Sequence, residues 1–231
     1  MAKTIGILGG MTPESTTVYY EHIIRTYQKR FGDYGFPEII IYSVSFQSYE
    51  DWMISGQWDA IAQGLTHAMM SLSKAGADFG VIATNTMHKV FHHIQANVPI
   101  PLLSIIDATA KAIQEKGMKS IGLLGTRFTM TEPFYREGLS AFGIETLIPD
   151  EEDRKIVDDI IFHELGKGEI RKESREKYVH IVRRLNKQGA EGVILGCTEI
   201  PLLISETDCD IPLFNTTILH AETALEYALE P

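Results

Sequence analysis

The sequence predicts an α/β protein made of two similar Rossmann-like, three-layer halves, related by a pseudo-twofold axis, with one active site between them. Short runs rich in Ile, Val and Leu alternate with amphipathic stretches along all 231 residues. Runs of this kind are typical of parallel strands that are covered on both faces. Three segments of the first half also recur, in the same order, in the second half. The alternation indicates a layered α/β fold, and the recurrence indicates that the fold occurs twice.

Strands and helices are expected in alternation from the N-terminus onward. The expected strands are residues 4–8, 38–44, 79–83, 102–104, 120–124, 146–148, 192–196 and 213–214. The clearest helical stretches are residues 14–31, 58–75, 106–116 and 171–188. The last two stop at Gly117 and Gly189, as helices often do. The segment that carries Tyr49, Trp52 and Trp58 is expected to be a loop whose aromatic rings pack inward or form a lid.

The internal repeat sets the expected domain boundaries. Residues 3–9 resemble 119–125, residues 76–84 resemble 189–197, and residues 100–103 resemble 211–214. Three ordered matches at nearly constant spacing are hard to obtain by chance. We therefore expect one domain of residues 1–104 plus 213–231 and a second domain of residues 105–212.

Composition argues against several classes of protein. The formal net charge is −10, whereas nucleic-acid binding needs a basic face. No apolar run approaches the roughly 18 residues of a membrane span, and no signal-peptide pattern is visible, so the expected location is cytoplasmic. Two cysteines, Cys197 and Cys209, are too few for a disulfide scaffold or a cysteine-based zinc site.

Thr84 and Cys197 occupy equivalent positions in the repeat, each just after a short apolar strand. Ligands bind at such strand ends in open α/β sheets. If the two halves face each other, these side chains approach one cleft from opposite sides, which suits racemisation because that reaction needs an acid or base on each face of a carbon. A thiol serves this purpose well, while a threonine hydroxyl is weak unless it is activated or relays to water. The alternatives are that Cys197 is a small buried apolar side chain and that Thr84 caps a helix.

Polar and glycine-rich segments accompany these two positions. Asn85 and Thr86 can hold a carboxylate, and His88 is either a proton relay or a structural histidine. The turn at Gly10 links a strand to a helix, with Thr12 as the expected N-cap, and such turns bind anions. The spacing of the glycines in this turn is not G-x-G-x-x-G, so NAD is not expected. His92 and His93, which follow His88, lack a further metal ligand on the same face, so no metal is expected.

Together the motifs resemble those of the aspartate/glutamate racemase family over essentially the whole chain. The resemblance rests on Gly9-Gly10-Met11 with Glu14-Ser15-Thr16, on Thr84-Asn85-Thr86-Met87-His88, and on Gly196-Cys197-Thr198-Glu199. It implies racemisation by 1,1-proton transfer without pyridoxal phosphate or any other cofactor. It also implies a small amino-acid substrate, with aspartate or glutamate foremost, and a homodimer.

The same resemblance implies roles for individual residues. Cys197 matches the family's second catalytic cysteine, and Thr84 stands where the first cysteine is common, as in the L-specific subgroup. The implied substrate-binding residues are Gly10, Met11, Asn85, Thr86, Thr198, Glu199 and, for the distal carboxylate, Lys167. An arginine that the family carries near its second strand has no counterpart between Arg30 and Arg127, which permits a broader substrate range.

Two other functions remain open at this point. The same site is compatible with a cysteine-dependent decarboxylase or cis–trans isomerase, for which loss of CO₂ from a malonate analogue is diagnostic. It is also compatible with a catalytically weak amino-acid-binding protein, in which the threonine marks lost catalysis. Tight binding without α-proton exchange distinguishes this last case.

Overall fold

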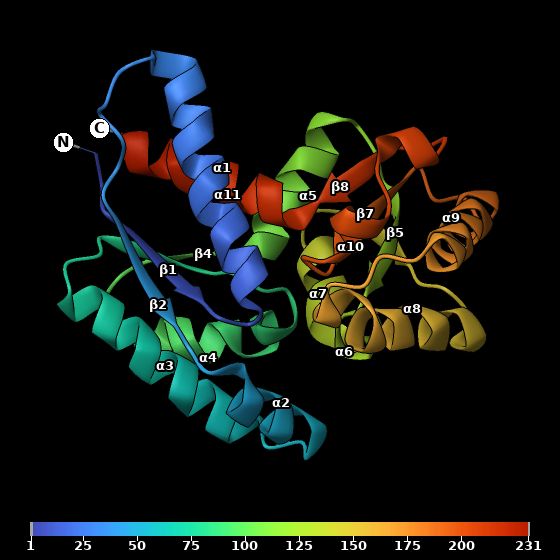
Figure 1. Ribbon diagram of the computed structural model, residues 1–231, viewed down its shortest axis with the longest axis horizontal. Coiled ribbons are helices and arrows are strands. Elements are labelled where there is room, and N and C mark those ends of the chain that lie inside the picture. Colours follow the sequence, from blue (N-terminus) through green and yellow to red (C-terminus); the bar gives the residue numbers. More distant parts are fainter. Residues whose placement is uncertain (1, 231) are drawn as a thin grey trace. The chain divides into compact units, whose positions relative to one another are not determined.

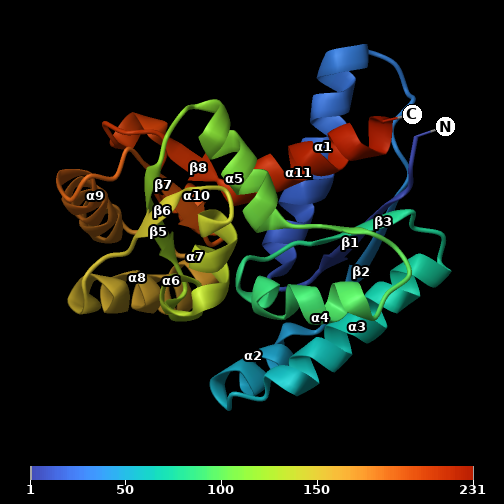
Figure 2. The same ribbon diagram turned by 180° about the vertical axis from the view of Figure 1, so that it is seen from behind.

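The computed structural model describes residues 2–230, and the chain divides into two compact units (Figures 1 and 2). The first unit contains the chain up to Ile105 and again from Thr217 onward, and the second contains Ile106–Thr216. Each unit has its own four-stranded parallel sheet.

The first unit is a sheet with helices on both faces. Its strand order is β2-β1-β3-β4, formed by β1 (Ile5–Gly9), β2 (Ile39–Ser43), β3 (Phe79–Ile82) and β4 (Leu102–Leu103). Its helices are α1 (Pro13–Phe31), α2 (Phe46–Ile54), α3 (Trp58–Lys74), the 3-10 turn η1 (Thr86–Val90), α4 (Phe91–Ala96) and α11 (Thr216–Leu229). Helices α1 and α11 cover one face, and α3 and α4 cover the other (Figure 1).

The second unit repeats this arrangement. Its strand order is β6-β5-β7-β8, formed by β5 (Ser120–Gly125), β6 (Glu145–Leu147), β7 (Gly192–Gly196) and β8 (Leu213–Asn215). Its helical elements are α5 (Ile105–Glu115), α6 (Arg127–Thr131), α7 (Pro133–Ser140), α8 (Glu151–His163), η2 (Leu165–Lys167), α9 (Lys172–Lys187), α10 (Ile200–Leu203) and η3 (Glu206–Asp208). The two strand orders are equivalent position by position, so the internal repeat corresponds to one sheet design used twice.

All eight expected strands are present, and the four expected long helices correspond to α1, α3, α5 and α9. The stretch with Tyr49 and Trp52 is not a loop, because both residues lie on α2, and Trp58 is the first residue of α3. Tyr49 and Met53 are the buried residues of α2, one helical turn apart. The aromatic residues of this segment therefore contribute to packing.

The boundary expected at residue 213 lies further along the chain. Strand β8 pairs in parallel with β7, from Val193↔Leu213 to Leu195↔Asn215, so it belongs to the second sheet. The chain returns to the first unit only in α11, from Thr217 onward. The C-terminal helix, and not the last strand, is therefore the part of the chain that returns to the first unit.

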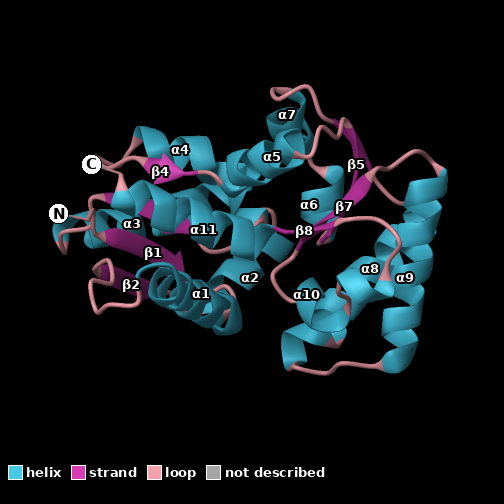
Figure 3. Ribbon diagram, turned by 90° about the horizontal axis from the view of Figure 1, so that it is seen from above, coloured by secondary structure: helices cyan, strands magenta, loops and turns pink. Residues whose placement is uncertain are grey.

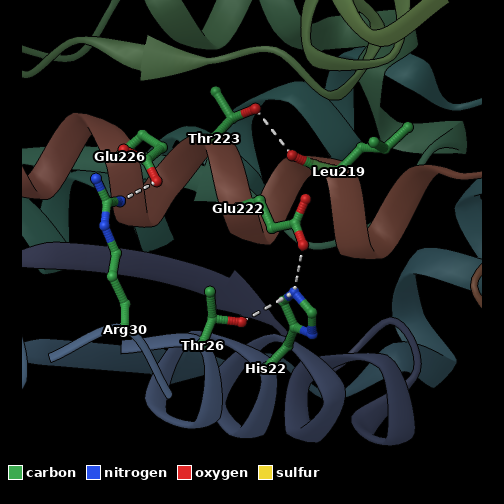
Figure 4. Close-up of polar contacts among 7 residues, drawn as sticks. All are labelled: His22, Thr26, Arg30, Leu219, Glu222, Thr223 and Glu226. Atoms are coloured by element: carbon green, nitrogen blue, oxygen red, sulfur yellow. Dashed lines mark hydrogen bonds and ion pairs between the residues drawn. The ribbon is translucent and has the colours of Figure 1, made fainter. Parts of the chain in front are cut away.

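Helix α11 is tied to the first unit by an apolar face and by a row of polar contacts with α1. Its Ala221, Ala224 and Leu225 belong to the same buried cluster as Tyr19 and Ile23 of α1. Figure 4 shows the polar row, in which the imidazole Nε2 of His22 lies 3.0 Å from Glu222 Oε1 and Arg30 lies 2.5 Å from Glu226. Because exposed ion pairs contribute little, the buried apolar contacts carry most of this attachment.

Candidate functional site

The carboxyl ends of neighbouring strands bring the predicted residues of the first unit to one edge of its sheet. Strands β1 and β3 run in parallel with Leu8 opposite Ile82. The segment from Gly10 therefore leaves the sheet beside the segment from Thr84. This edge is where open α/β sheets bind ligands.

The Gly9–Gly10 turn is held by close backbone packing. A Cβ on Gly9 would lie 2.2 Å from Thr16 Oγ1, and one on Gly10, whose φ is +90°, would lie 2.3 Å from the Val44 carbonyl oxygen. Glycine is therefore required at both positions. The Gly10 N–H donates to Thr16 Oγ1 at 2.8 Å, so this N–H is not free to bind a carboxylate.

Thr12 and the start of α1 secure the same edge. Thr12 precedes Pro13 as the N-cap residue, without a side-chain capping bond. The single hydroxyl hydrogen of Ser15 is shared between the Thr12 carbonyl, 2.8 Å from Oγ, and the Ala83 carbonyl, 3.2 Å from Oγ. This second bond joins α1 directly to the backbone that leads into Thr84. Met11, the next predicted residue, is buried at 4% exposure.

The run from Thr84 to His88 is buried and turns back at once toward the sheet. Thr84, Asn85 and Thr86 are 9%, 2% and 7% exposed. The Thr84 N–H donates to the Ile82 carbonyl at 2.8 Å, which turns the chain sharply at the strand end. Among residues 2–230, no hydrogen-bond partner of the Thr84 hydroxyl is found within the first unit.

His88 is a structural histidine with a fixed tautomer. The Ile105 N–H donates to Nε2 at 3.0 Å, so Nε2 is the unprotonated nitrogen. Nδ1 therefore carries the proton and donates it to the Thr84 carbonyl at 2.8 Å. Burial, reinforced by the charge of His220, lowers the pKa of His88 to about 3. With both nitrogens bonded to backbone, the ring positions Thr84 and does not relay protons.

A second buried histidine, His220 of α11, is held in the same manner. Tyr19 OH lies 2.7 Å from its Nδ1, and Nε2 lies 3.0 Å from the Leu103 carbonyl. Only an Nε2–H can donate to that carbonyl, so Nδ1 accepts from the tyrosine. Burial lowers the pKa of His220 to about 4.

These two histidines predict loss of stability in acid. Both folded-state pKa values lie below the ordinary 6.5, at about 3 for His88 and about 4 for His220, so the unfolded chain binds more protons below that pH. Their contribution is complete above pH 6.5 and decreases as the pH falls. By linkage the two rings together lower the free energy of unfolding by about 4 kcal/mol at pH 5.

Urea unfolding between pH 7.5 and 5 measures this effect. We expect His220→Gln to reduce the slope of the unfolding free energy against pH by the equivalent of about one proton, because one linked group is removed. His67→Gln, the same substitution at an exposed histidine, is the matched control. Equal slopes for wild type and His220→Gln would contradict the assignment.

In the second unit, strands β5 and β7 bring Thr126 and Cys197 to the equivalent sheet edge. Gly125 lies opposite Gly196 in the ladder. A Cβ on Gly196 would lie 2.8 Å from the Leu124 carbonyl oxygen. The two strand ends are therefore too close for any residue but glycine at this position. Thr126 caps α6 by accepting the Thr129 N–H at 3.3 Å.

Cys197 forms a buried pair with Glu199. The Sγ atom donates to Glu199 Oε2 at 2.8 Å, and the Thr198 hydroxyl donates to the same oxygen at 2.8 Å. Cys197 is 9% exposed and Glu199 is 6% exposed. Burial, together with the charge of Glu199 and the hydrogen bond to it, raises the pKa of the Cys197 thiol well above its usual range. The thiol is therefore the resting form, with a carboxylate in position to accept its proton.

The predicted residues thus fall into two groups and one outlier. Gly10, Met11 and Thr84–Thr86 gather in the first unit, while Cys197, Thr198 and Glu199 gather in the second. Lys167 is an exposed residue of η2. Its neighbour Leu165 shares the buried cluster of Ile200, the first residue of α10, so the Lys167 segment packs near the helix that follows the Cys197 motif.

The sequence predicts Glu199 as a substrate ligand and gives no sign of its bond to Cys197. Nor does it point to Tyr178, a fully buried residue of α9 whose hydroxyl donates to the Val157 carbonyl at 3.0 Å. Burial raises the pKa of Tyr178 well above its usual range, and the negative charge of an ionised Cys197 raises it further. The sequence places Tyr178 on the apolar face of an amphipathic helix and gives no other sign of its position near Cys197.

Comparison with known proteins adds independent information. Residues 8–224 match the family model described as Asp/Glu/hydantoin racemase. The broad-specificity amino-acid racemase RacX of Bacillus subtilis is 25% identical over 224 residues, covering 96% of each chain. Among solved structures, a candidate Asp/Glu racemase from Yersinia pestis is 45% identical with a TM-score of 0.93, covering 99% of this chain and 100% of the other. PH1733 from Pyrococcus horikoshii, an aspartate racemase homologue, is 39% identical with a TM-score of 0.86 and the same coverage.

Proposed function

This chain is an amino-acid racemase of the Asp/Glu/hydantoin racemase family, and we propose that it interconverts the enantiomers of aspartate or glutamate by proton transfer between Cys197 and Thr84. The observation that carries the proposal is the equivalence of the two strand ends. Thr84 follows β3 and Cys197 follows β7, which are corresponding strands of two sheets with the same order. In the proposal each of these two side chains serves one face of the α-carbon.

The Cys197–Glu199 pair supplies the base that forms more readily. Between them the resting pair holds one proton, on Sγ, with the carboxylate 2.8 Å away. Transfer of that proton to Glu199 leaves a thiolate that takes the α-proton from the substrate. The pair then holds two protons, and the bonding electrons of the Cα–H bond remain on the substrate as a carbanion. In the reverse direction the doubly protonated pair returns a proton to the same face.

Thr84 serves the opposite face as a hydroxyl. Its Oγ donates a proton to the carbanion and recovers one from water, while the Cys197–Glu199 pair releases its second proton to water, so that both sides return to their resting protonation. An alkoxide is a far stronger base than a thiolate, but it forms less readily. The α-proton is therefore removed more slowly from the enantiomer whose α-hydrogen faces Thr84. The two enantiomers therefore differ in the rate of α-proton removal, although their equilibrium ratio in free solution is one.

Asn85, Thr86 and Thr198 are the proposed ligands of the α-carboxylate. All three lie at strand ends, where side-chain donors and backbone N–H groups meet a bound anion. Fixed donors that face the carboxylate stabilise the charge that develops when the α-proton leaves. Gly10 and Met11 contribute shape in this proposal, because the Gly10 N–H is already bonded to Thr16.

Lys167 is the proposed ligand of the distal carboxylate. It is a cation on a segment that packs near α10, and its exposure leaves the ammonium group able to meet an incoming substrate. A single flexible lysine provides a point charge and no bidentate geometry, so it discriminates weakly between side-chain lengths. RacX, which covers nearly the same length, is named for broad specificity, and we propose a similar breadth here.

The proposed enzyme needs no cofactor, because two side chains of the chain provide the acid and the base. It acts as a cytoplasmic homodimer on a small amino acid. No helix among the described residues is both long enough and apolar enough to cross a membrane.

Incubation of a panel of L-amino acids and their D enantiomers in D₂O tests the function. We expect α-deuterium in aspartate or glutamate, accompanied by the other enantiomer, and a faster initial rate from one enantiomer than from the other. Cys197→Ala serves as the matched control. Binding without exchange, or release of CO₂ from a malonate analogue instead of exchange, would replace the proposal by one of the other two functions.

A further inference from the structure

The outer edge of the first sheet is unusually open and apolar. Strand β2 is the outermost strand of its sheet, with β1 on its inner side (Figure 3). Its sequence Ile-Ile-Ile-Tyr-Ser contains no charge or proline, the residues that usually block such an edge. Ile41 is 42% exposed and Tyr42 is 36% exposed. An edge of this kind pairs readily with another strand.

The backbone groups that face outward can be identified from the ladder. The Ile5 N–H donates to the Glu38 carbonyl at 2.8 Å, and the Val44 N–H donates to the Gly9 carbonyl at 3.0 Å. Residues 38 and 44 therefore face β1, and by the two-residue period of a strand so do 40 and 42. Ile39, Ile41 and Ser43 consequently present their N–H and C=O groups away from the sheet.

Exposed apolar side chains concentrate in the part of the sequence that contains β2. Among the described residues, seven of the nine large apolar side chains with substantial exposure lie between residues 18 and 54, and only Ile170 and Leu202 lie elsewhere. Tyr20 of α1, 46% exposed, lines a shallow hollow of about 260 Å³ together with Ile41 and Ser43. This hollow lies directly beside the free edge and can receive a side chain from a strand that pairs there.

The equivalent edge of the second unit provides an internal comparison. Strand β6 occupies the same position as β2 in its sheet, but it has three residues instead of five and begins with the charged Glu145. Short length and charge are the usual protection of an edge strand. Two sheets of one design thus differ at this edge, so the open edge of β2 is not an unavoidable consequence of the fold.

We infer that β2 pairs with β2 of a second copy of this chain, antiparallel about a twofold axis at Ile41. This inference specifies the surface of the homodimer in the proposed function and rests on that proposal only for the oligomeric state. In this register Ile41 meets Ile41 of the copy, and Ile39 meets Ser43 of the copy, so each outward N–H faces an outward carbonyl. The two four-stranded sheets become one sheet of eight strands.

The charge distribution along the chain agrees with a second copy at this edge. A twofold axis places like groups near each other, and this chain carries a formal net charge of −10. Residues 39–49 nevertheless contain no charged side chain. The edge is therefore a place where two copies meet without repulsion, and the strand is complementary to itself.

Sedimentation equilibrium of the full chain over a range of dilutions tests the inference. We expect wild type to show twice the chain mass of 25.9 kDa. Ile41→Lys is expected to show the single-chain mass, because the twofold axis places two lysines together. Ile170→Lys, a matched change at an exposed apolar residue of the second unit, is expected to remain dimeric.

Hydrogen exchange of the wild type gives a second readout that does not depend on folding of a variant. The amides of Ile39, Ile41 and Ser43 are expected to be protected in the dimer and to lose protection on dilution. A monomer at every concentration overturns the inference, as does a dimer that persists in Ile41→Lys or leaves these three amides unprotected. Racemase activity enters neither readout, so failure of the proposed reaction is distinguishable from failure of this interface.

Discussion

Replacement of Cys197 by alanine is expected to lower kcat at least about 10³-fold, since a positioned acid or base contributes roughly 10²–10⁴. Cys197 lies at the end of a fully buried strand and packs at the border of a large apolar cluster. Alanine keeps the β-carbon and removes one atom, so the fold is expected to remain intact. Polarimetry or chiral chromatography measures the rate, and circular dichroism verifies the fold.

A companion variant separates the two sides of the reaction. Thr84→Ala removes the proposed donor on one face and leaves the Cys197–Glu199 pair on the other. We expect it to lose racemisation while it still exchanges the α-proton of one enantiomer with D₂O, because the pair removes and returns a proton on the same face. Cys197→Ala is expected to lose both activities.

The pattern across the two variants is the diagnostic result. Near-normal racemisation by folded Cys197→Ala would contradict the mechanism outright. Undiminished racemisation by Thr84→Ala would show that water or another group serves the second face. Exchange of both enantiomers by Thr84→Ala at equal rates would contradict the assignment of one side chain to each face.

The fold was predictable because its signals are local and repeated. Each buried strand is a short aliphatic run, and the matches around Gly9/Gly125 and Thr84/Cys197 place those runs in the same order twice. The position of β8 was less accessible. Its pairing with β7 is a long-range contact, and the apolar run itself does not tell which sheet it joins. Helix α2 was missed because its two buried residues, Tyr49 and Met53, give too short a periodic signal.

The site was predictable in its residue types and less so in its bonding. Residue spacing put Thr84 and Cys197 at equivalent strand ends, which the strand bounds agree with. The direction in which a side chain points depends on packing, and here it decides two roles. His88 is bonded at both nitrogens to backbone, and Glu199 accepts from Cys197. A sequence shows neither fact, because the partners Ile105 and Thr84 of His88 are specified only by the fold.

Replacement of Glu199 by glutamine is expected to move two properties of Cys197 in opposite directions. The carboxylate raises the thiol pKa through its charge and its hydrogen bond, so its loss lowers that pKa toward the ordinary value, while the effect of burial remains. More thiolate is then present near neutral pH. At the same time the acceptor for the Sγ proton is gone, so each catalytic cycle lacks the group that holds the second proton.

Alkylation by iodoacetamide as a function of pH measures the first property. In a Cys209→Ser background only Cys197 can react. We expect the alkylation profile of Glu199→Gln to shift to lower pH, because the negative charge and the hydrogen bond that favour the protonated thiol are gone. Over the same range kcat is expected to fall at least about tenfold, within the span assigned to general acid–base groups.

Glu199→Asp is the matched control, because it keeps the charge and shortens the reach. It is expected to keep the thiol pKa high while kcat falls, since the shorter carboxylate meets Sγ less closely. Thr198→Val removes the other donor to Oε2 and leaves the pair itself in place. If Glu199→Gln slowed alkylation and racemisation together, the carboxylate would promote ionisation of the thiol, and its charge would not be what holds the thiol pKa high. If it left both unchanged, the thiol would draw its basicity from another group, and the pairing of Cys197 with Glu199 would have no part in proton transfer.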